Sequence, residues 1–237
     1  MSPDTDQAWW SPHPDLLLPE PELEPLHQRD YLVRAYKRDD SSALIRGAVM
    51  DLRPGRPFAD RVAAAGGNDD GRPLPIHHMI VDLVVAYPDM TIIDADVVFE
   101  SHPHSACPGI KPRYRELIGL SIARGFTHEV RRRFGGPRGC THTTALLQAM
   151  SPVAVQCSFA MRDSGLAARS VPFRSNEGGD GDHDAVGAFS AFMKDTCHVW
   201  AEDGEFWQGV TMGRVPPVPL TIRDRLRAAG IDPAGTS

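Results

Sequence analysis

The sequence predicts an α+β fold in which a small antiparallel sheet has helices packed on one face. The first observation is a β-hairpin: residues 76–86 and 91–100 are dense in branched apolar residues, and Tyr87-Pro88-Asp89-Met90 between them has turn chemistry. The second is an alternation within residues 91–100, where one face carries Ile93, Ala95, Val97 and Phe99. The other face carries Ile92, Asp94, Asp96, Val98 and Glu100. Because one face is apolar and the other partly polar, helices are expected to cover one side only.

Two further strands are expected before the hairpin. Residues 31–36 form an apolar run, and residues 43–52 alternate apolar residues with others. Residues 53–75 are rich in Gly, Pro and Asp, which predicts an exposed insertion with a short helix at residues 58–65.

The pattern becomes helical after the hairpin. Helices are predicted at residues 112–122, at residues 128–134 with Thr127 as the N-cap and Gly135-Gly136 as the end, and at residues 222–229. A long helix opened by Cys140 or Thr141 is expected to run to Arg162, with a kink near Pro152. Residues 163–187 are expected to form a loop, and residues 188–200 another helix or a mixed segment.

Composition divides the chain into three parts. Residues 1–29 are rich in Pro, Glu and Asp and are predicted to be a poorly ordered N-terminal arm, whose strong apolar element is Trp9-Trp10. Residues 30–212 are predicted to be a single α+β domain, and residues 213–237 a C-terminal arm.

Charge and hydropathy narrow the function classes. The formal net charge of −6 provides no basic field for nucleic acid. No apolar stretch approaches the roughly 20 residues that span a membrane, and the N-terminus lacks the pattern of a signal peptide. Four cysteines are too few for a disulfide scaffold, so we expect reduced thiols and a cytoplasmic protein. The sequence contains no nucleotide cofactor motif, since neither a P-loop nor a dinucleotide glycine fingerprint is present.

The turn Gly139-Cys140-Thr141-His142 is the strongest candidate for a chemical site. It follows a Gly/Pro turn and opens an apolar helical run, which places a thiol and an imidazole on the first turn of a helix. Free backbone N–H groups and the helix dipole favour the thiolate there, and a thiolate attacks electrophiles and binds metals. Cys140 and His142 are therefore candidate catalytic residues.

A metal site is the alternative chemistry for the same turn. Cys107, Cys140, His142 and one carboxylate would supply four ligands of the types that zinc and iron prefer. The neighbours His77 and His78 point to opposite faces of a predicted strand, so at most one of them can serve a given site, and His77 shares its face with Met79 and Val81. His102 and His104 lie close to Cys107 in sequence and are weaker candidates.

Several of these blocks together resemble a bacterial family of domains of unknown function, number 2889. The resemblance covers residues 30–200, and Gly139-Cys140-Thr141-His142 is its most specific part. The other blocks are Tyr36-x-Arg38, Ile76-His77-His78-Met79, Ile93-Asp94-Ala95 and Cys107-Pro108. The family name assigns no activity.

The order of elements is also similar, more distantly, to the U-type iron–sulfur cluster scaffold proteins. Ile93-Asp94-Ala95 resembles their strand motif, Cys107 the cysteine that follows it, and Cys140 with His142 their His-Cys pair. Asp89 falls where that family has a hairpin-tip aspartate ligand, whereas the cysteine it has at the tip is missing here. The resemblance therefore implies a single zinc or iron ion held by Asp89, Cys107, Cys140 and His142 rather than cluster assembly.

Three functions follow from these observations. The first is a metal-binding protein, catalytic if one coordination position is open and structural if four ligands close the site. The second is a metal-free thiol-dependent enzyme with Cys140 as nucleophile and His142 as base. The third is a non-enzymatic interaction module in which the Trp9-Trp10 arm binds a partner. The sequence does not identify the small molecule or protein partner.

Overall fold

The structure is a computed structural model that describes residues 22–165, 194–212 and 220–231. The chain divides into two compact units, residues 1–159 and residues 160–237. The first unit contains the sheet and the larger number of the described helices, whereas the second contains short helices.

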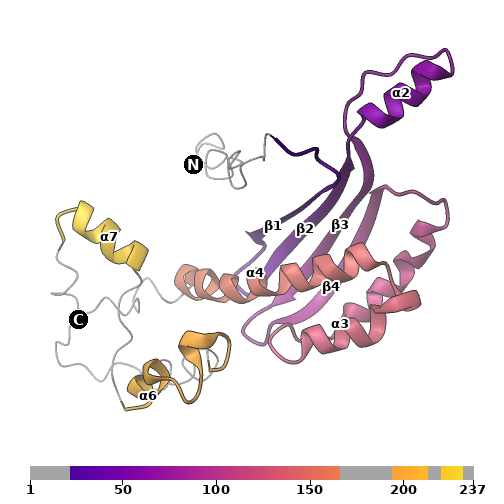
Figure 1. Cartoon of the computed structure of the whole chain (residues 1–237). Coiled ribbons are helices and arrows are strands. Elements are labelled where there is room, and N and C mark those ends of the chain that lie inside the picture. The colour runs from indigo at the N-terminus through magenta and orange to yellow at the C-terminus, as the bar shows by residue number, and fades with distance from the viewer. Residues whose placement is uncertain (1–21, 166–193, 213–219, 232–237) are drawn as a thin grey trace. The chain divides into compact units, whose positions relative to one another are not determined.

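The sheet of the first unit has four antiparallel strands in the order β1-β2-β3-β4 (Figure 1). They are β1 Gln28–Lys37, β2 Ser42–Arg53, β3 Leu74–Ala86 and β4 Thr91–Ser101. Each strand pairs with the next one along the chain, so local turns connect β1 to β2 and β3 to β4. The predicted α+β fold with an antiparallel sheet is confirmed.

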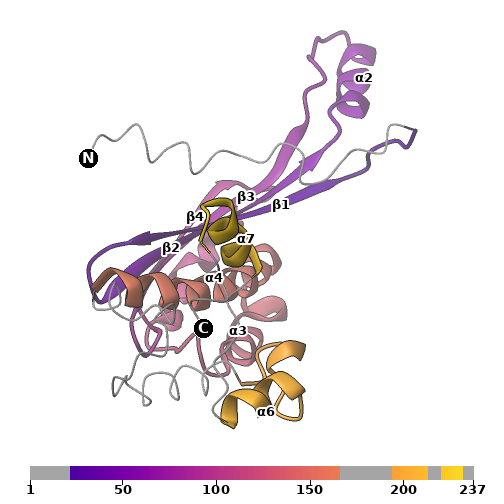
Figure 2. The ribbon, with the colours of Figure 1, turned by 90° about the vertical axis from the view of Figure 1, so that its left-hand side faces the viewer.

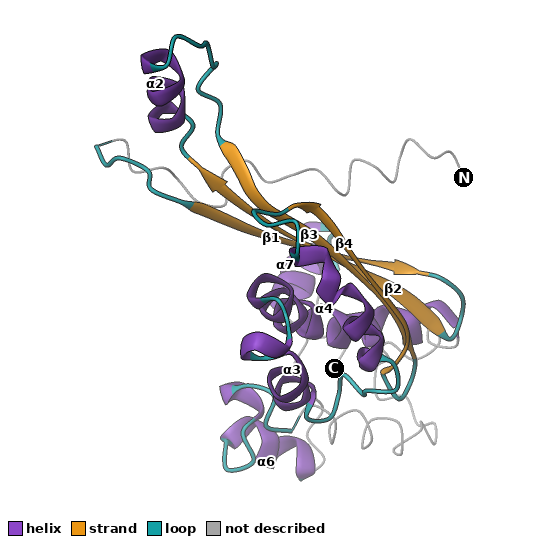
Figure 3. Ribbon diagram, turned by 90° about the vertical axis from the view of Figure 1, so that its right-hand side faces the viewer, coloured by secondary structure: helices purple, strands orange, loops and turns teal. Residues whose placement is uncertain are grey.

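Helices occupy the connection between β2 and β3 and the segment after β4. The connection carries α2 Arg56–Ala64, and β4 is followed by the 3₁₀ helix η2 Cys107–Leu117, α3 Phe126–Phe134, the 3₁₀ turn η3 Gly136–Arg138 and α4 Thr141–Gly165. Figures 2 and 3 show α3 and the first part of α4 on the same side of the sheet. The second unit contains the 3₁₀ turn η5 His198–Trp200, α6 Glu205–Thr211 and α7 Leu220–Ala228.

The core lies between the sheet and α4. Apolar side chains on alternate positions of the central strands are fully buried, as are those of one face of α4: Ile45, Val49, Val81, Leu83, Leu146, Leu147 and Met150. Gly47 lies beneath this helix, because a Cβ atom there would lie 2.7 Å from Sδ of Met150 and 3.0 Å from Cδ1 of Leu146. The missing side chain at Gly47 lets α4 approach the sheet closely.

The predicted face assignment of β4 is wrong at its start. Ile92 is fully buried and Ile93 is 48% exposed, because the pairing shifts where Val84 lies opposite Asp94 but Val85 lies opposite Ile92. The extra residue in β4 reverses the alternation at that point, as a β-bulge does. From Ala95 onward the predicted alternation of buried and exposed residues holds as far as Val98.

Two predicted helix details also change, and a third, the kink near Pro152, stays a prediction. The helix expected at residues 112–122 is instead the 3₁₀ helix η2, which begins earlier and contains Pro112. Thr127 lies inside α3, and the N-cap is Gly125 in the left-handed conformation with φ 64°. Pro152 lies within α4, where it cannot donate a backbone hydrogen bond. The carbonyl of Gln148 accepts a hydrogen bond from Oγ of Ser151 instead.

Several expectations concern residues that the structure does not describe. These include Trp9-Trp10 and most of the predicted N-terminal arm, and the start of the segment at residues 188–200. They also include most of the loop expected at residues 163–187, whose first three residues belong instead to α4. The domain bounds of 30 and 212 stay a prediction. In the described ranges, no helix combines the length and apolar composition needed to cross a membrane.

Replacing Gly47 by Val should destabilise the protein, because the new side chain would enter the contact between β2 and α4. We expect the free energy of unfolding to fall by about 2 kcal/mol, as measured by urea denaturation. Gly109→Val is the matched control, since a Cβ atom at Gly109 meets nothing within 4 Å, and it should change stability by less than about 0.5 kcal/mol. Equal effects of the two substitutions would contradict the packing described.

Candidate functional site

The site is built around Asp51, which is the last buried residue of β2. Ala43, Ile45, Gly47, Val49 and Asp51 follow one another on the helix-covered face of this strand, so strand alternation carries a carboxylate into the core. Only 1% of the Asp51 side chain is exposed. Arg29 of β1 donates two hydrogen bonds to it, from Nε to Oδ1 at 2.6 Å and from Nη2 to Oδ2 at 2.7 Å. This bidentate geometry is the strong form of an arginine–carboxylate pair.

Two histidines converge on the same carboxylate oxygen. His77 lies directly opposite Asp51 in the pairing of β2 with β3, and its Nδ1 is 3.0 Å from Oδ2. His142 is the second residue of α4, and its Nε2 is 3.1 Å from the same Oδ2. The two imidazole rings stack with centroids 3.7 Å apart and planes inclined by 27°. Asp51, His77 and His142 therefore bring three metal-ligand atoms within 4.8 Å of one another.

A closed ring of hydrogen bonds fixes the start of α4. The backbone N–H of Cys140 donates to the hydroxyl of Tyr114 at 3.0 Å, this hydroxyl bonds to Oγ1 of Thr143, and Oγ1 donates to the carbonyl of Cys140 at 3.0 Å. Tyr114 and Thr143 are both fully buried. The ring satisfies one of the free backbone donors of a helix start and holds Cys140 and His142 in place.

Burial and charge set the protonation states of the site. The guanidinium of Arg29 holds the pKa of Asp51 far below its usual range, so this carboxylate is ionised at neutral pH. Burial lowers the pKa of His142, and repulsion from His77 lowers it further. At neutral pH His142 is thus an uncharged imidazole that faces an ionised carboxylate.

The two nitrogens of the His142 ring face different partners. Nε2 faces Asp51, whereas Nδ1 lies 3.6 Å from Sγ of Cys140. Because an ionised carboxylate only accepts hydrogen bonds, Nε2 carries the proton when no cation lies between them. Nδ1 then has a free lone pair directed at the thiol of Cys140.

Comparison with known families agrees with the sequence resemblance. The model of the family described as a protein of unknown function, DUF2889, matches residues 27–156, which is more than half of the 237-residue chain. The chain belongs to this family. The matched segment contains Arg29, Asp51, His77 and His142. No curated protein and no solved structure matches, and the resemblance to iron–sulfur scaffold proteins receives no support from these comparisons.

The structure brings together only part of the predicted ligand set. Cys140 and His142 are neighbours, as expected from the sequence. Asp89 lies in the turn that follows β3, at the opposite end of that strand from His77, and its carbonyl accepts a hydrogen bond from Ser121. Cys107 begins η2 and does not join the converging group. Among the described residues, Asp51 and His77, rather than Asp89 and Cys107, lie beside His142.

Asp51 and Arg29 were missed by the sequence reasoning, although Asp51 left a signal. It continues the apolar face of a predicted strand, and an acidic residue in such a series is unusual unless it is paired. The sequence predicts His77 on one strand face with Met79 and Val81, and the structure places it on that buried face. His102 and His104 bond locally, from Nδ1 of the first to the carbonyl of the second, and lie outside the cluster.

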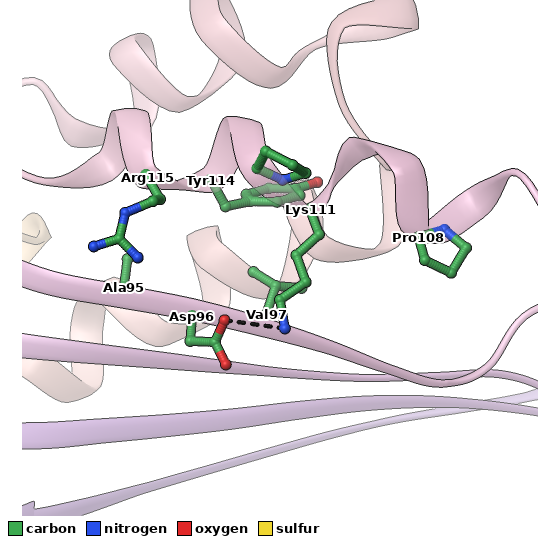
Figure 4. Close-up of a pocket in the computed structure, with 8 residues that line it drawn as sticks. Ala95, Asp96, Val97, Pro108, Lys111, Tyr114 and Arg115 are labelled. Carbon is green, nitrogen blue, oxygen red and sulfur yellow. Dashed lines mark ion pairs between the residues drawn. The ribbon is translucent and has the colours of Figure 1, made fainter.

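A separate cavity of about 310 Å³ lies between β4 and η2 (Figure 4). Lys111 spans it to pair with Asp96 at 3.2 Å, and the ring of Tyr114 forms part of the wall. None of Asp51, His77 and His142 lines this cavity. Among the residues that line the cavity, Tyr114 alone therefore contacts the site, because its hydroxyl accepts a hydrogen bond from the backbone N–H of Cys140.

Replacing Asp51 by Asn should remove the negative charge that pairs with the Arg29 guanidinium and faces the imidazoles of His77 and His142. We expect the free energy of unfolding at pH 7 to fall by about 3 kcal/mol, near the low end for a broken buried pair because Arg29 is one-third exposed. Glu129→Gln, which breaks a partly exposed bidentate pair with Arg132, is the control and should cost less than about 1 kcal/mol.

The stabilisation that Asp51 provides should also depend on pH, and the same variant measures this dependence. Because the folded-state pKa of Asp51 is lowered, the stabilisation is complete above the unfolded value of about 3.9 and is lost as pH falls through the folded value. The stability difference between wild type and Asp51→Asn, measured by urea denaturation, should therefore shrink from pH 4 to pH 2, a range that lies below the ordinary titration of the two histidines. A difference that grows as pH falls would contradict this assignment.

Proposed function

We propose that this protein binds one zinc or iron ion through Asp51, His77 and His142. The observation that carries the proposal is the convergence of Nδ1 of His77 and Nε2 of His142 on one oxygen of Asp51, at 3.0 and 3.1 Å. In a tetrahedral zinc site with bonds of about 2.0–2.1 Å, neighbouring ligand atoms lie about 3.3 Å apart. Small shifts of the three side chains would open that space.

The protonation of the ligands supports the proposal. Metal ligands must be deprotonated, and the lowered pKa values of Asp51 and His142 keep the first ionised and the second neutral at neutral pH. Binding then requires only that Nε2 of His142 and Nδ1 of His77 give up their protons to solvent or to the second ring nitrogen. For His142 the second ring nitrogen is Nδ1, which faces Cys140.

Two groups that neighbour the ligands would orient them without binding the metal themselves. Arg29 donates one hydrogen bond to each carboxylate oxygen, which leaves the second lone pair of Oδ2 for a cation. Cys140 lies on the Nδ1 side of His142, so its sulfur would accept the Nδ1–H bond and orient the ring rather than bind the metal. The proposed ligand set therefore has three members: Asp51 and His77 on the helix-covered face of the sheet, and His142 on α4, which covers that face.

A site with three protein ligands keeps a coordination position open. Two histidines and one carboxylate form the ligand set of catalytic zinc sites and of non-haem iron(II) oxygenases. We therefore favour a catalytic metal, which would activate a bound water or substrate, over a closed structural one. The reduced thiols that this proposal requires fit a cytoplasmic protein.

Metal analysis tests the ligand set directly. Purified full-length protein incubated with zinc and dialysed should hold one equivalent by inductively coupled plasma mass spectrometry. His77→Asn and His142→Asn should hold less than one-tenth of an equivalent, because each removes one of three ligands. Cys140→Ser should keep the full equivalent but bind zinc about tenfold more weakly, as for loss of an outer-shell partner.

Three controls distinguish this set from the one the sequence predicts. Asp89→Asn, Cys107→Ser and His78→Asn should all keep full zinc, since the first two lie outside the cluster and His78 occupies the opposite face of β3. Wild-type protein without stoichiometric metal, or loss of metal in Cys107→Ser, would contradict the proposal.

A second function has its own geometric support. Cys140, His142 and Asp51 form a line in which Sγ is 3.6 Å from Nδ1 and Nε2 is 3.1 Å from Oδ2. This is the order of nucleophile, base and orienting acid in thiol-dependent enzymes. In metal-free protein Asp51 would hold the proton on Nε2, and Nδ1 would accept the proton of the thiol.

Thiol labelling tests this second function in chelator-treated protein. Cys140 should react with iodoacetamide at pH 7 faster than Cys157, whose thiol pKa is raised by burial, with the labelled sites identified by peptide mass spectrometry. His142→Asn should slow the labelling of Cys140 by at least about tenfold, because the base is removed. Labelling of Cys140 at the rate of a simple model thiol, unaffected by His142→Asn, would exclude the nucleophile.

A further inference from the structure

The face of the sheet opposite α3 and α4 carries a second pattern. Residues that lie directly opposite one another in the four strands share a face, so the strand pairing defines rows across the sheet. Figure 3 shows the sheet nearly edge-on, with α3 and the first part of α4 on the other side. In the described part of the first unit, residues 22–159, no helix lies on this open face.

One row of the open face is apolar across all four strands. It contains Leu32, Ala48, Ile80 and Val98, of which Leu32 is 53% and Val98 is 37% exposed. Exposed Val and Leu side chains aligned on a sheet are typical of a surface that another layer covers.

The neighbouring row is charged and divided by sign. It contains Arg34 of β1, Arg46 of β2, Asp82 of β3 and Asp96 of β4. Arg46 and Asp82 form a bidentate pair at 2.7 and 2.6 Å, and Asp96 pairs with Lys111 at the sheet edge. Both cations thus lie on one half of the sheet and both carboxylates on the other.

We propose that this open face binds a second copy of the chain through a two-fold axis parallel to the strands, between β2 and β3. Such an axis places β1 of one copy over β4 of the other, and β2 over β3. Arg34 then faces Asp96 of the second copy, and Arg46 faces its Asp82. The charged row is complementary to itself because its two halves have opposite sign.

The same axis pairs the remaining rows. In the apolar row the small Ala48 faces the larger Ile80, and Leu32 faces Val98, so side chains of different size interdigitate. In the row on the other side of the charges, Leu44 faces Val84, and Tyr36 faces Asp94. The symmetry therefore opposes apolar to apolar residues in the first row and positive to negative residues in the second. In the third row it opposes Leu44 to Val84 at the centre and the Tyr36 ring to the Asp94 carboxylate at the edges.

The size of the face suits a dimer. Four strands at about 4.8 Å spacing and ten residues at about 3.3 Å rise give a face of roughly 600 Å² in projection. Side-chain relief increases this area toward the about 800 Å² per partner of a stable interface. The balance of two arginines and two aspartates disfavours nucleic acid and lipid surfaces, which require one sign of charge.

Charge reversal tests the pairing in the full-length chain. By sedimentation velocity, wild type should form a dimer, and Arg34→Glu or Asp96→Arg alone should each raise the dimer dissociation constant at least tenfold, because like charges then face one another. The double variant Arg34→Glu/Asp96→Arg should restore the wild-type constant, since the pairs are exchanged between the copies. Circular dichroism should show that all three variants are folded.

Further measurements separate this interface from other causes of association. Ile80→Glu places a charge in the apolar row and should give a monomer, whereas Arg132→Glu, on α3, should leave the dimer unchanged. His142→Asn should also leave the dimer unchanged, so the proposed interface and the proposed metal site are tested independently of each other. Monomeric wild type at the highest soluble concentration, or a double variant no tighter than the singles, would overturn the proposal.

Discussion

The buried carboxylate of Asp51 is the charge around which the first unit is organised. Taking a carboxylate out of water costs several kcal/mol unless partners replace the lost hydration. Arg29 from β1, His77 from β3 and His142 from α4 supply them, so one side chain ties three elements to the end of β2. Tyr114 and Thr143 fix α4 at the place where His142 reaches that carboxylate.

His142 decides which chemistry this arrangement supports, because a neutral imidazole carries a single N–H. With the proton on Nε2, the ring donates to Asp51 and offers Nδ1 as a base to Cys140, as a thiol nucleophile requires. With the proton on Nδ1, the ring offers Nε2 to a metal beside Asp51 and His77, and Cys140 becomes the outer partner. The two proposed functions thus require different neutral tautomers of His142. A bound cation would favour the tautomer with its proton on Nδ1.

Local patterns in the sequence predict most of the fold and one half of the site. The hairpin of β3 and β4, the helix start at Cys140 and the buried face of His77 all follow from the period of apolar residues and from turn chemistry. The pairing of Asp51 with His77 does not, because the insertion carrying α2 separates them and strand register is a long-range property. Asp89 is a predicted ligand because the scaffold resemblance implies a ligand at the hairpin tip. However, β3 has 13 residues, and at about 3.3 Å per residue its two ends are roughly 40 Å apart.

The most direct test is the protonation of the ring nitrogens, read from ¹⁵N–¹H correlation spectra of the imidazoles at neutral pH. In metal-free protein we predict His142 as the neutral Nε2–H tautomer and His77 with a proton on Nδ1, both bonded to Asp51. One equivalent of zinc should shift the Nε2 resonance of His142 and the Nδ1 resonance of His77 to values typical of metal-bound nitrogen. A metal-free His142 with its proton on Nδ1, or zinc that leaves both nitrogens unchanged, would contradict the account.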